Sequence, residues 1–510
     1  MINRRRLLQG AALAGMAGAV APLLPFARAK AAAPPSEEWK QAFDTALKTD
    51  PHLLGWQGVT VEALDAPSPV LEGAWPAELA GTFYRNGPAQ HERGGARYRH
   101  WFDGDGMVQA FRIEGGKVAH RGRFVATEKR AVEQAAGRLV VPAFGTTAPE
   151  SSSLGSADEI NPGNIAPLFH AGELLALWEG GSAHVVDAES LETRGRKVWR
   201  DDLKGLPFTA HPKVEADGTL WGFGYDATGG RLVLYHIGPD GALKNVGLVP
   251  AAPLGMVHDF VVTERHLVFA LAPLVIEPGR FDAQTSFLDG HVWRPELGMR
   301  ALAVAKDDLK TTQSWQLPAG FSFHFGNAWE EADGTIRFDY CVGPDATLMT
   351  ETLRYVMRGE WRSATAPMRF AEVVLRPRGD AGEQTVGAEA AEFPRVAPGV
   401  VGRRYRHVYS LGASDWDWFT AVVKRDLESG ERQVFDYGAD YIAEEHVFVP
   451  RPGAAAEDDG WLIGTALDIA RGVTTLNLFD ARKPAGGPLA RAVLPYALPL
   501  GFHGIFAPNV

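Results

Sequence analysis

The sequence predicts a large all-β protein, and a β-propeller is the architecture that suits it best. The chain has 510 residues, of which 45% are hydrophobic, and its 57 glycines and 34 prolines are scattered along its length. Short aromatic or β-branched runs end at turn residues, whereas stretches of helical periodicity are few. The chain has more short strands than a single β-sandwich contains, and a propeller arranges them without long exposed edges.

The first 29 residues predict an export signal rather than part of the fold. The paired arginines Arg4 and Arg5 precede a short run rich in alanine, glycine and leucine, which ends in an Ala-x-Ala pattern. The arginine pair is typical of twin-arginine leaders, which export folded proteins. We therefore expect residues 1–29 to be a cleaved leader, residues 30–510 to be a single domain, and the protein to be periplasmic. Retention of the leader as a membrane anchor is the alternative.

The elements can be predicted in order along the chain. A polar helix is expected within residues 34–50, and further helices are expected at 131–139 and 299–309. Strands are expected where apolar and polar residues alternate, at 81–87, 107–113, 174–181, 266–272, 406–412 and 474–481. Dipeptides suited to hairpin turns recur at Asp105-Gly106, Asp217-Gly218, Asp240-Gly241, Asp289-Gly290, Asp333-Gly334 and Ser429-Gly430.

Composition excludes several classes of function. The formal net charge is -11, and beyond the leader no cluster of basic residues is present, so nucleic acid is not an expected partner. The single cysteine, Cys341, excludes an internal disulfide and any metal site built on several thiolates. A metal in this chain would have to be held by histidines and carboxylates.

Four of the 15 histidines lie in apolar or glycine-rich surroundings: His211, His258, His324 and His503. Each alone would be interpreted as a hydrogen-bonded core residue. Burying four imidazoles costs free energy unless every ring finds a partner, and one metal would satisfy all of them. Their separations of 47, 66 and 179 residues exclude a local helical motif. They would have to converge from different structural units, as the innermost strands of a propeller do.

Seven motifs in order along the chain resemble those of the carotenoid cleavage oxygenase family, which includes carotenoid, apocarotenoid and lignostilbene dioxygenases and retinoid isomerohydrolases. The motifs are HWFDGDGM, AHPK, VHDFVVT, FHFGNAWEE, EFPRVAP, EHVFVPRPGAAAEDDGWL and GFHGIF, and they extend from about residue 81 to residue 506. The resemblance implies a seven-bladed propeller with a helical cap over one axial, non-haem Fe(II).

The resemblance also implies a set of site residues. His211, His258, His324 and His503 correspond to the iron ligands, and O2 would be the co-substrate. Glu179, Glu392 and Glu445 correspond to glutamates that orient these histidines through their second ring nitrogen. Glu444 is adjacent to Glu445 and is the alternative, because His446 stands where the family usually has proline. Because only three such glutamates correspond to four histidines, one histidine must be oriented in another way.

Other residues of these motifs are predicted to support the scaffold. Asp103 and Asp105 are expected in a tight turn, and Asp259, next to His258, is expected to orient the backbone. Trp329 and Glu330 are expected to pack against or support the strand that follows His324.

Within the resemblance, the reaction is oxidative cleavage of a conjugated C=C bond of a small apolar alkene. The stretch around HWFDGDGM is more similar to the carotenoid branch, which favours a carotenoid or apocarotenoid substrate. The alternative is a lignostilbene or phenylpropene with a 4-hydroxyphenyl group, for which Lys129 and Tyr98 would bind the phenol. The competing interpretation of Lys129 is a solvated lysine at a strand end.

Two further possibilities concern partners and function. A substrate dissolved in lipid would require an apolar entrance, for which residues 271–281 and 138–144 are candidates, and a peripheral membrane contact for its uptake. The chain could also be a propeller that only binds a ligand, or one that isomerises or hydrolyses a retinoid-like ester.

Overall fold

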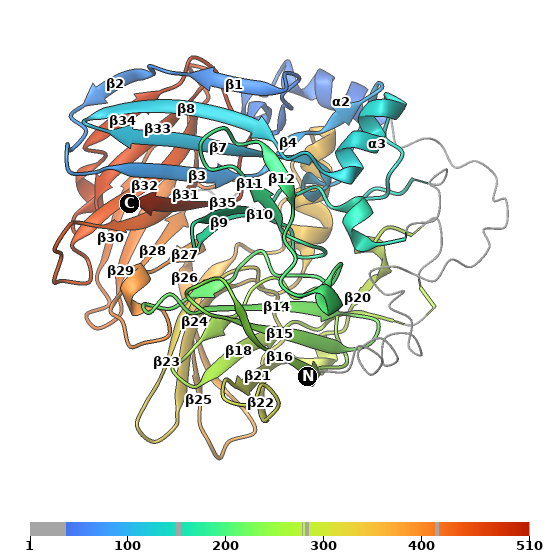
Figure 1. Cartoon of the computed structure of the whole chain (residues 1–510), viewed down its shortest axis with the longest axis vertical. Coiled ribbons are helices and arrows are strands. Elements are labelled where there is room, and N and C mark those ends of the chain that lie inside the picture. Colours follow the sequence, from blue (N-terminus) through green and yellow to red (C-terminus); the bar gives the residue numbers. More distant parts are fainter. Residues whose placement is uncertain (1–36, 149–154, 278, 281–284, 414–417, 509–510) are drawn as a thin grey trace.

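The protein is a seven-bladed β-propeller with few helices (Figure 1). The computed structural model describes residues 37–148, 155–277, 279–280, 285–413 and 418–508. The predicted leader, residues 1–29, lies outside the described residues. The fold class predicted from the sequence is confirmed.

Each blade is an antiparallel sheet of four or five main strands. Blade 1 contains β1 (Ala63–Ala66), β8 (Lys117–Phe124), β7 (Asp105–Glu114), β3 (Gly81–Asn86) and β35 (His503–Pro508). Blade 2 contains β12 (Thr193–Arg196), β11 (His184–Val186), β10 (Glu173–Leu177) and β9 (Ala166–His170). Blade 3 contains β13 (Lys213–Val214), β14 (Leu220–Asp226), β15 (Arg231–Ile237) and β16 (Leu243–Pro250). Blade 4 contains β17 (Val261–Val262), β18 (His266–Leu271), β21 (Met299–Ala305) and β22 (Thr312–Leu317).

The remaining blades follow in chain order. Blade 5 contains β23 (Phe325–Glu330), β24 (Ile336–Val342), β25 (Arg369–Leu375) and β26 (Glu383–Ala390). Blade 6 contains β27 (Glu392–Arg395), β28 (His407–Gly412), β29 (Ala421–Asp426) and β30 (Arg432–Asp436). Blade 7 contains β31 (Tyr441–Pro450), β32 (Gly460–Asp468), β33 (Val473–Asp480), β34 (Ala490–Val493) and β2 (Val70–Gly73). Short strands lie outside these blades: β4 (Pro88–Gln90), which pairs with β7, and the hairpins β5 (Glu92–Arg93) with β6 (Ala96–Arg97) and β19 (Leu274–Ile276) with β20 (His291–Trp293).

The two ends of the described chain close the ring together. The C-terminal β35 pairs with β3 in blade 1, and the N-terminal β2 pairs with β34 in blade 7. Around the centre, β9, β35, β31, β27, β23 and β17 contact one another in turn. Residues at the start of these inner strands are therefore brought towards one axis.

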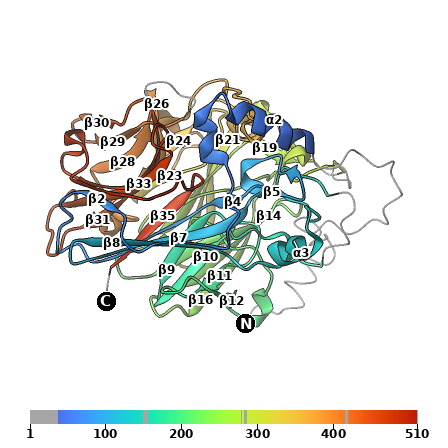
Figure 2. The ribbon, with the colours of Figure 1, turned by 90° about the horizontal axis from the view of Figure 1, so that it is seen from above.

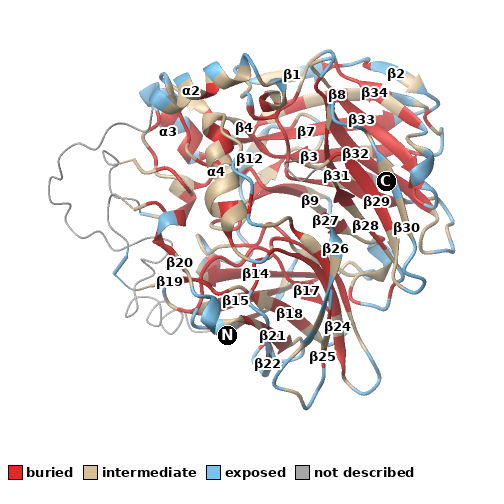
Figure 3. Ribbon diagram, turned by 180° about the vertical axis from the view of Figure 1, so that it is seen from behind, coloured by how far each residue is buried: buried red, intermediate tan, exposed pale blue. Residues whose placement is uncertain are grey.

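The packing between blades explains why the ring is stable. An apolar cluster fills each of the seven gaps between adjacent blades, and Figure 3 shows buried residues running along the strands of the sheets. Burying one large apolar side chain contributes about 1.5–3 kcal/mol. Each blade depends on two neighbours, so the closure between blades 7 and 1 matters as much as the other six gaps.

The six strands expected from alternation are confirmed, but one predicted helix is wrong. Residues 299–309 contain β21, which lies between β18 and β22 with most of its residues buried. A strand covered on both faces is apolar throughout, and periodicity cannot distinguish it from a buried helix. Four of the six predicted turns join successive strands, whereas Asp105 begins β7 and Asp289-Gly290 lies in a short 3-10 helix.

Helices cover one side of the propeller. They are α2 (Glu37–Leu47), the 3-10 helix η1 (Pro51–Trp56) and a continuous helical segment, residues 348–358, made of η7 (Leu348–Thr352), α4 (Leu353–Tyr355) and η8 (Val356–Arg358). An apolar cluster joins this cap to blade 7 through Phe43, Val356 and Leu467. Helix α3 (Glu128–Ala136) lies on the same side of the molecule as α2, opposite β29 and β30 (Figures 1 and 2). No helix among the described residues is long and apolar enough to cross a bilayer.

Candidate metal centre

The four predicted histidines converge from four blades. His211, His258 and His324 stand just before the innermost strands β13, β17 and β23, and His503 is the first residue of β35. All four are at least 92% buried, with exposed fractions of 3% to 8%. The strands of separate blades start near one axis, which is why residues so distant in sequence meet there.

The Nε2 atoms face one another. His211 Nε2 lies 2.9 Å from His258 Nε2, His258 Nε2 lies 3.3 Å from His324 Nε2, and His324 Nε2 lies 3.2 Å from His503 Nε2. The four ligand atoms all lie within 4.8 Å of one another. Two ligands of one ion, at right angles with bonds of about 2.1 Å, lie about 3 Å apart, so the spacing fits a single metal.

Three glutamates hold the opposite side of these rings. His258 Nδ1 donates to Glu179 (2.5 Å), His324 Nδ1 to Glu392 (2.5 Å) and His503 Nδ1 to Glu445 (3.0 Å). Among the described residues, no carboxylate accepts a hydrogen bond from His211. Glu179 follows β10, Glu392 begins β27 and Glu445 lies in β31, so each of the seven blades supplies one histidine or one glutamate.

These contacts fix the tautomer of the neutral rings. Because Nδ1 carries the donated proton, the Nε2 atom of each of these three neutral histidines presents a lone pair to the centre. Several lone pairs at about 3 Å repel one another unless a cation lies between them. The donor set is therefore that of a four-histidine metal site, and neutral imidazole suits ferrous iron among other divalent ions.

A bulge in β31 settles the choice between the two adjacent glutamates. The pairing with β32 shifts between Ala443 and His446, so Glu444 and Glu445 together face one residue of the partner strand. Glu445 accepts from His503, Gly504 and Arg395, whereas Glu444 accepts from Arg85 and Gly501. Glu445 is the residue that orients a histidine, as preferred from the sequence.

The burial of the site separates the pKa values of its groups. Burial lowers the pKa of His211 and His324 well below the usual value and that of His503 to about 4. Burial opposes protonation of His258 as well, but Glu179 outweighs it and raises the pKa. Burial raises the pKa of Glu392 to about 8, while Arg395 and His503 overcome burial and lower the pKa of Glu445.

Asp259 ties three of the histidine segments together. Its carboxylate accepts from the backbone N–H of Phe260 (2.7 Å) and of Phe325 (2.9 Å), the residue after His324. It also forms an ion pair of 2.7 Å with Lys213, two residues after His211. The prediction that Asp259 orients backbone is confirmed, and the structure adds that it does so for blade 5 as well as its own, while its ion pair with Lys213 reaches blade 3.

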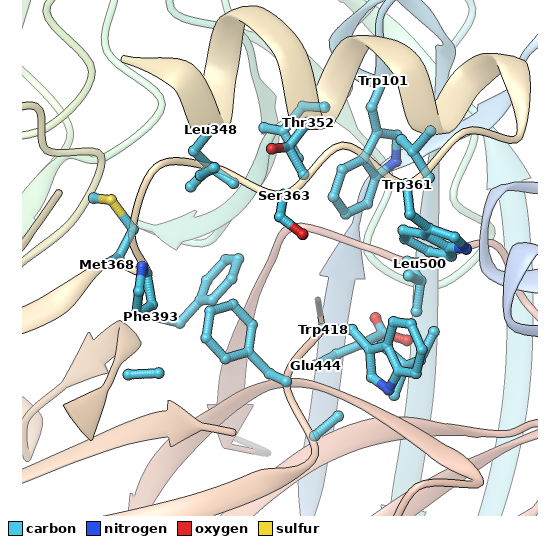
Figure 4. A pocket seen from close by; sticks show the side chains of 18 of the residues that line it. Trp101, Leu348, Thr352, Trp361, Ser363, Met368, Phe393, Trp418, Glu444 and Leu500 are labelled. Carbon is cyan, nitrogen blue, oxygen red and sulfur yellow. The ribbon is translucent and has the colours of Figure 1, made fainter. Parts of the chain in front are cut away.

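Two adjoining apolar cavities lead to the histidines. The inner cavity, about 770 Å³ counting space open to solvent, is lined by His258, His324, His503 and aromatic residues that include Phe102, Phe323 and Phe502. The outer cavity, about 1010 Å³ on the same basis, lies beneath the helical segment 348–358 (Figure 4). Both are lined by Trp101, Leu348, Leu353, Phe393 and Phe419, so they share a wall or a passage.

Phe393 is a site residue that the sequence analysis did not identify. Its backbone φ is +53°, uncommon for a residue with a side chain, and its N–H donates to the carboxylate of Glu392. Its ring stacks on His324 with centroids 4.8 Å apart. The only available signal was its position directly after a predicted glutamate.

Lys129 and Tyr98 lie in a buried network within the scaffold. Lys129, on α3, is fully buried rather than solvated at a strand end, and its ammonium contacts Tyr98, Asp105 (2.8 Å) and Glu133 (3.3 Å). Neither Lys129 nor Tyr98 is among the described residues that line the two cavities. Their binding of a substrate phenol stays a prediction.

The remaining predicted residues support the scaffold. Asp103 accepts hydrogen bonds from Gly145, Thr146 and His100, and Asp105 forms ion pairs with Arg93, Lys129 and Arg130. Glu330 accepts from Thr263, Arg265 and His266 and links blade 5 to blade 4, while Trp329 packs on Tyr405.

Most described residues of the two candidate entrance stretches are buried or half-buried, and Arg138, Gly279 and Arg280 are exposed. Leu139 and Val141, and Leu271, Leu274 and Val275, are at most 7% exposed, and Phe144 lines the inner cavity. Phe281 lies outside the described residues. The buried residues of these stretches therefore contribute to the core and to the cavity wall.

Comparison with known proteins gives consistent findings. Residues 58–508 match the family model described as RPE65, retinal pigment epithelial membrane protein. The chain is 30% identical over 465 residues to the apocarotenoid-15,15'-oxygenase of Synechocystis, covering 86% of this chain and 92% of that protein. The cobalt-substituted Synechocystis apocarotenoid oxygenase superimposes with a TM-score of 0.80 at 28% identity, covering 90% of this chain and 99% of that one. The lignostilbene dioxygenase of Pseudomonas brassicacearum gives 0.80 at 28% identity, covering 89% and 97%.

Proposed function

The chain belongs to the carotenoid cleavage oxygenase family and is a double-bond-cleaving dioxygenase, and on this premise we propose that it uses Fe(II) to cleave a carotenoid or apocarotenoid. In the proposed reaction one conjugated C=C bond is broken and O2 is consumed. Each of the two alkene carbons receives one oxygen atom, which gives two carbonyl products and needs no other oxidant or reductant.

The observation that carries the proposal is the meeting of four histidine Nε2 atoms at the wall of an apolar cavity. His211, His258, His324 and His503 would hold the iron, which when bound supplies the one-electron chemistry that O2 needs. Four neutral ligands leave the full +2 charge on such an ion. Glu179, Glu392 and Glu445 orient the rings of His258, His324 and His503. The hydrogen bonds from Nδ1 keep the Nε2 atoms of these three rings free of a proton.

The cavities supply the position of the substrate. The phenylalanines and tryptophans that line the walls bury an elongated apolar molecule and exclude water from the reacting bond. No described acid or base is required to move a proton, because both products are formed by addition of oxygen alone.

The size and polarity of the cavities favour the carotenoid class over stilbenes. Together they extend from the histidines to the space beneath the helical segment 348–358, which suits a long polyene. A phenol-binding pair in the cavity wall would favour a stilbene, but Lys129 and Tyr98 are occupied with Asp105 and Glu133. Lignostilbene cleavage remains the alternative, since a lignostilbene dioxygenase is also a relative.

A panel assay on the purified holoenzyme tests the proposal. The enzyme should contain about one iron per chain and consume O2 with an apocarotenal, giving aldehydes that chromatography separates. Resveratrol and isoeugenol are the comparison substrates, and His258→Ala is the inactive control. Cleavage of the phenols without cleavage of any polyene would overturn the carotenoid assignment, and full activity in His258→Ala would overturn the four-histidine centre.

We also propose export of the folded protein to the periplasm, supported by the arginine pair and apolar run within residues 1–29. Such a route would allow the metal to be inserted before transport. Fractionation of cells that express the whole chain, compared with an Arg4→Lys, Arg5→Lys double variant, tests it. Equal periplasmic amounts of both proteins would contradict twin-arginine export.

A further inference from the structure

Four tryptophan rings follow one another from the inner cavity towards the surface of the cap. The ring centroids of Trp101 and Trp56 lie 5.3 Å apart, and those of Trp56 and Trp361 also lie 5.3 Å apart. Trp418 comes next, 5.2 Å from Trp361. Every contact between two tryptophan rings in the described part of the chain belongs to this tryptophan series. Figure 4 shows Trp101, Trp361 and Trp418 along one side of the outer cavity.

The two ends of the tryptophan series lie at the metal centre and at solvent. At the inner end, Trp101 contacts the ring of Phe502 with centroids 4.8 Å apart, and Phe502 directly precedes the predicted ligand His503. At the outer end, the imidazole of His52 stacks on Trp418 with centroids 4.1 Å apart, and the side chain of His52 is 23% exposed. Contacting rings and one peptide bond therefore connect the centre with the surface.

Indole is among the side chains that lose one electron most readily, whereas the phenyl ring of phenylalanine is resistant to such oxidation. The rate at which an electron tunnels falls exponentially with distance, so rings in contact exchange electrons quickly. The tryptophan series can thus pass an electron inward one ring at a time. Phe502 is a bridge between Trp101 and the centre and is not itself oxidised.

The partners of the indole N–H groups give this transfer a direction. The Nε1 atoms of Trp101 and Trp56 are buried and have no acceptor among the described residues, whereas Trp361 Nε1 donates to the carboxylate of Asp50 (2.5 Å). Loss of an electron makes an indole N–H strongly acidic. Oxidised Trp361 can give its proton to Asp50 and become neutral, while the inner two rings keep a positive charge in an apolar wall, which is costly.

Asp50 is held in place to accept this proton. Its Oδ1 accepts from the backbone N–H of His52 (3.0 Å) and lies 3.0 Å from Nδ1 of the same histidine, which leaves Oδ2 to Trp361. Burial raises the pKa of Asp50, but the hydrogen bonds from Trp361 and His52 outweigh burial and lower it. The carboxylate is therefore charged at neutral pH and can take up a proton.

We propose that the tryptophan series carries oxidising equivalents away from the metal centre when O2 is activated with no alkene in the cavity. This protective function goes beyond alkene cleavage, and it rests on the proposed function in requiring an O2-activating metal at the four histidines. Its location is the wall of the cavity itself, where an oxidant without a substrate first meets protein.

The electrons and protons balance as follows. An oxidant formed from O2 at the centre gains one electron from Trp101, and Trp101 regains one from Trp56, which regains one from Trp361. The N–H proton of Trp361 moves to Asp50. A reductant in solution, of the thiol or ascorbate class, supplies one electron through Trp418, and the proton returns from Asp50 to Trp361.

The test uses iron-loaded protein without an alkene, exposed either to O2 or to hydrogen peroxide. Peroxide yields a one-electron oxidant at protein-bound ferrous iron whether or not the protein cleaves alkenes, so this arm does not depend on the proposed function. Peptide mass spectrometry should find added oxygen mainly in Trp361 and Trp418. Electron paramagnetic resonance of freeze-quenched samples should show an organic radical whose signal narrows when the tryptophans carry ring deuterium. Zinc-loaded protein is the control and should show neither.

Trp361→Phe is the informative variant, because it keeps an aromatic ring but interrupts the transfer. Oxidation of Trp418 should fall to the level of the zinc sample. Oxidation should appear instead at Trp101 and at Trp178, which lines the inner cavity and has no ring contact among the described residues. Trp361→Tyr restores an oxidisable ring and should restore oxidation of Trp418.

Two further variants separate electron transfer from packing. Trp39 belongs to the same apolar cluster of the cap but stacks on Tyr355, outside the tryptophan series, so Trp39→Phe should leave the oxidation pattern unchanged. Asp50→Asn keeps every ring and removes the charged proton acceptor. Oxidation should then move inward from Trp361 to Trp56.

The outcomes distinguish this inference from the proposed function. The same oxidation pattern in the parent and in Trp361→Phe, or parent oxidation confined to Trp178 and the ligand histidines, overturns the inference even if an alkene is cleaved. If peroxide gives the predicted pattern but no alkene is cleaved, the tryptophan series stands and the proposed function fails. If Trp361→Phe does not fold, Trp56→Phe interrupts the series one ring earlier, and loss or retention of Trp418 oxidation in that variant decides.

Discussion

At the scale of single residues, the centre depends on how the second nitrogen of each histidine is held. Three of the four rings donate Nδ1–H to a glutamate, and these carboxylates keep the Nε2 lone pairs aimed at one point. His211 has no such partner among the described residues. Its segment is held instead by the ion pair between Lys213 and Asp259.

Replacing Glu179 should weaken metal binding without removing a ligand. In Glu179→Gln the proton position on His258 is no longer enforced, and loss of such an outer partner typically costs 10–100-fold in metal affinity. Metal content after dialysis against a graded chelator measures the change.

The chain provides a matched control for this variant. Glu330 accepts from His266 Nδ1 at 2.7 Å, the same kind of pair outside the centre. Glu330→Gln should lower stability but retain the parent's metal affinity. Equal metal loss in both variants would show that the effect of Glu179 is a general one on the fold.

Removing the charge of Asp259 should loosen three blades at once. Asp259→Asn weakens the pair with Lys213 and leaves one backbone N–H of Phe260 or Phe325 without its charged acceptor. We expect a loss of about 1–3 kcal/mol in the free energy of unfolding, together with easier metal loss. Denaturant titration of holo and metal-free protein measures both; an unchanged stability of the metal-free protein would contradict this account.

At the scale of elements, β35 has two tasks that the chain combines in its last residues. It carries His503 and it completes blade 1 by pairing with β3. The approach is close, because a Cβ at Gly501 would lie 2.5 Å from Arg85 Nε and one at Gly504 would lie 2.6 Å from the ring of Phe83. Glycine at these positions lets the backbone reach the crowded axis.

Deleting residues 501–510 should therefore remove both the metal and the closure of the ring. Metal content should fall to background, and the thermal unfolding midpoint should fall sharply, because the apolar cluster between blades 7 and 1 loses its cover. His503→Ala in the full chain is the control, since it loses the ligand but keeps the strand. A truncated protein as stable as His503→Ala would contradict the role of β35 in closure.

Helix α3 is anchored by a buried cluster of charges. Lys129 and Glu133 lie one turn apart on α3 and meet Asp105 of β7, and all three side chains are at most 2% exposed. Lys129→Met should leave carboxylates without their partner and lower the free energy of unfolding by about 3–5 kcal/mol. Chemical denaturation measures it. An undiminished stability would show that the cluster is not required for folding, and a selective loss of stilbene cleavage in a stable protein would support the predicted phenol role.

At the scale of the whole molecule, a metal held by the four histidines would link four blades at the axis. Four of the seven blades place a ligand on it, and the other three place a glutamate behind a ligand. A ligand bound only by the folded state adds stability as its concentration exceeds its dissociation constant, about 4 kcal/mol at a thousandfold excess.

Metal removal should therefore lower the unfolding midpoint of the parent by several degrees, because the closed ring loses a common partner at its centre. Calorimetry of the holoenzyme, the chelated protein and the reloaded protein measures this. The variant His258→Ala, which lacks one of the four ligands, should show a much smaller change in its unfolding midpoint on chelation. Identical midpoints for the holoenzyme and the chelated parent would contradict a structural contribution of the metal.

The sequence by itself determined the strand-rich class, the positions of most strands and the identity of the four converging histidines. Alternation and turn residues report local geometry, and the ordered motifs restrict the fold. It could not distinguish a strand buried on both faces from a helix at 299–309, nor could it show that Lys129 is buried, because both depend on neighbours far away in the chain.

The tertiary structure alone decided which carboxylate faces which ring. Glu444 and Glu445 are adjacent and chemically identical, and only the bulge opposite β32 directs one to His503 and the other to Arg85 and the outer cavity. It also decided that Glu444 lines the outer cavity. Hydrogen bonds between distant blades are fixed by the closure of the ring, and no local pattern of residues encodes them.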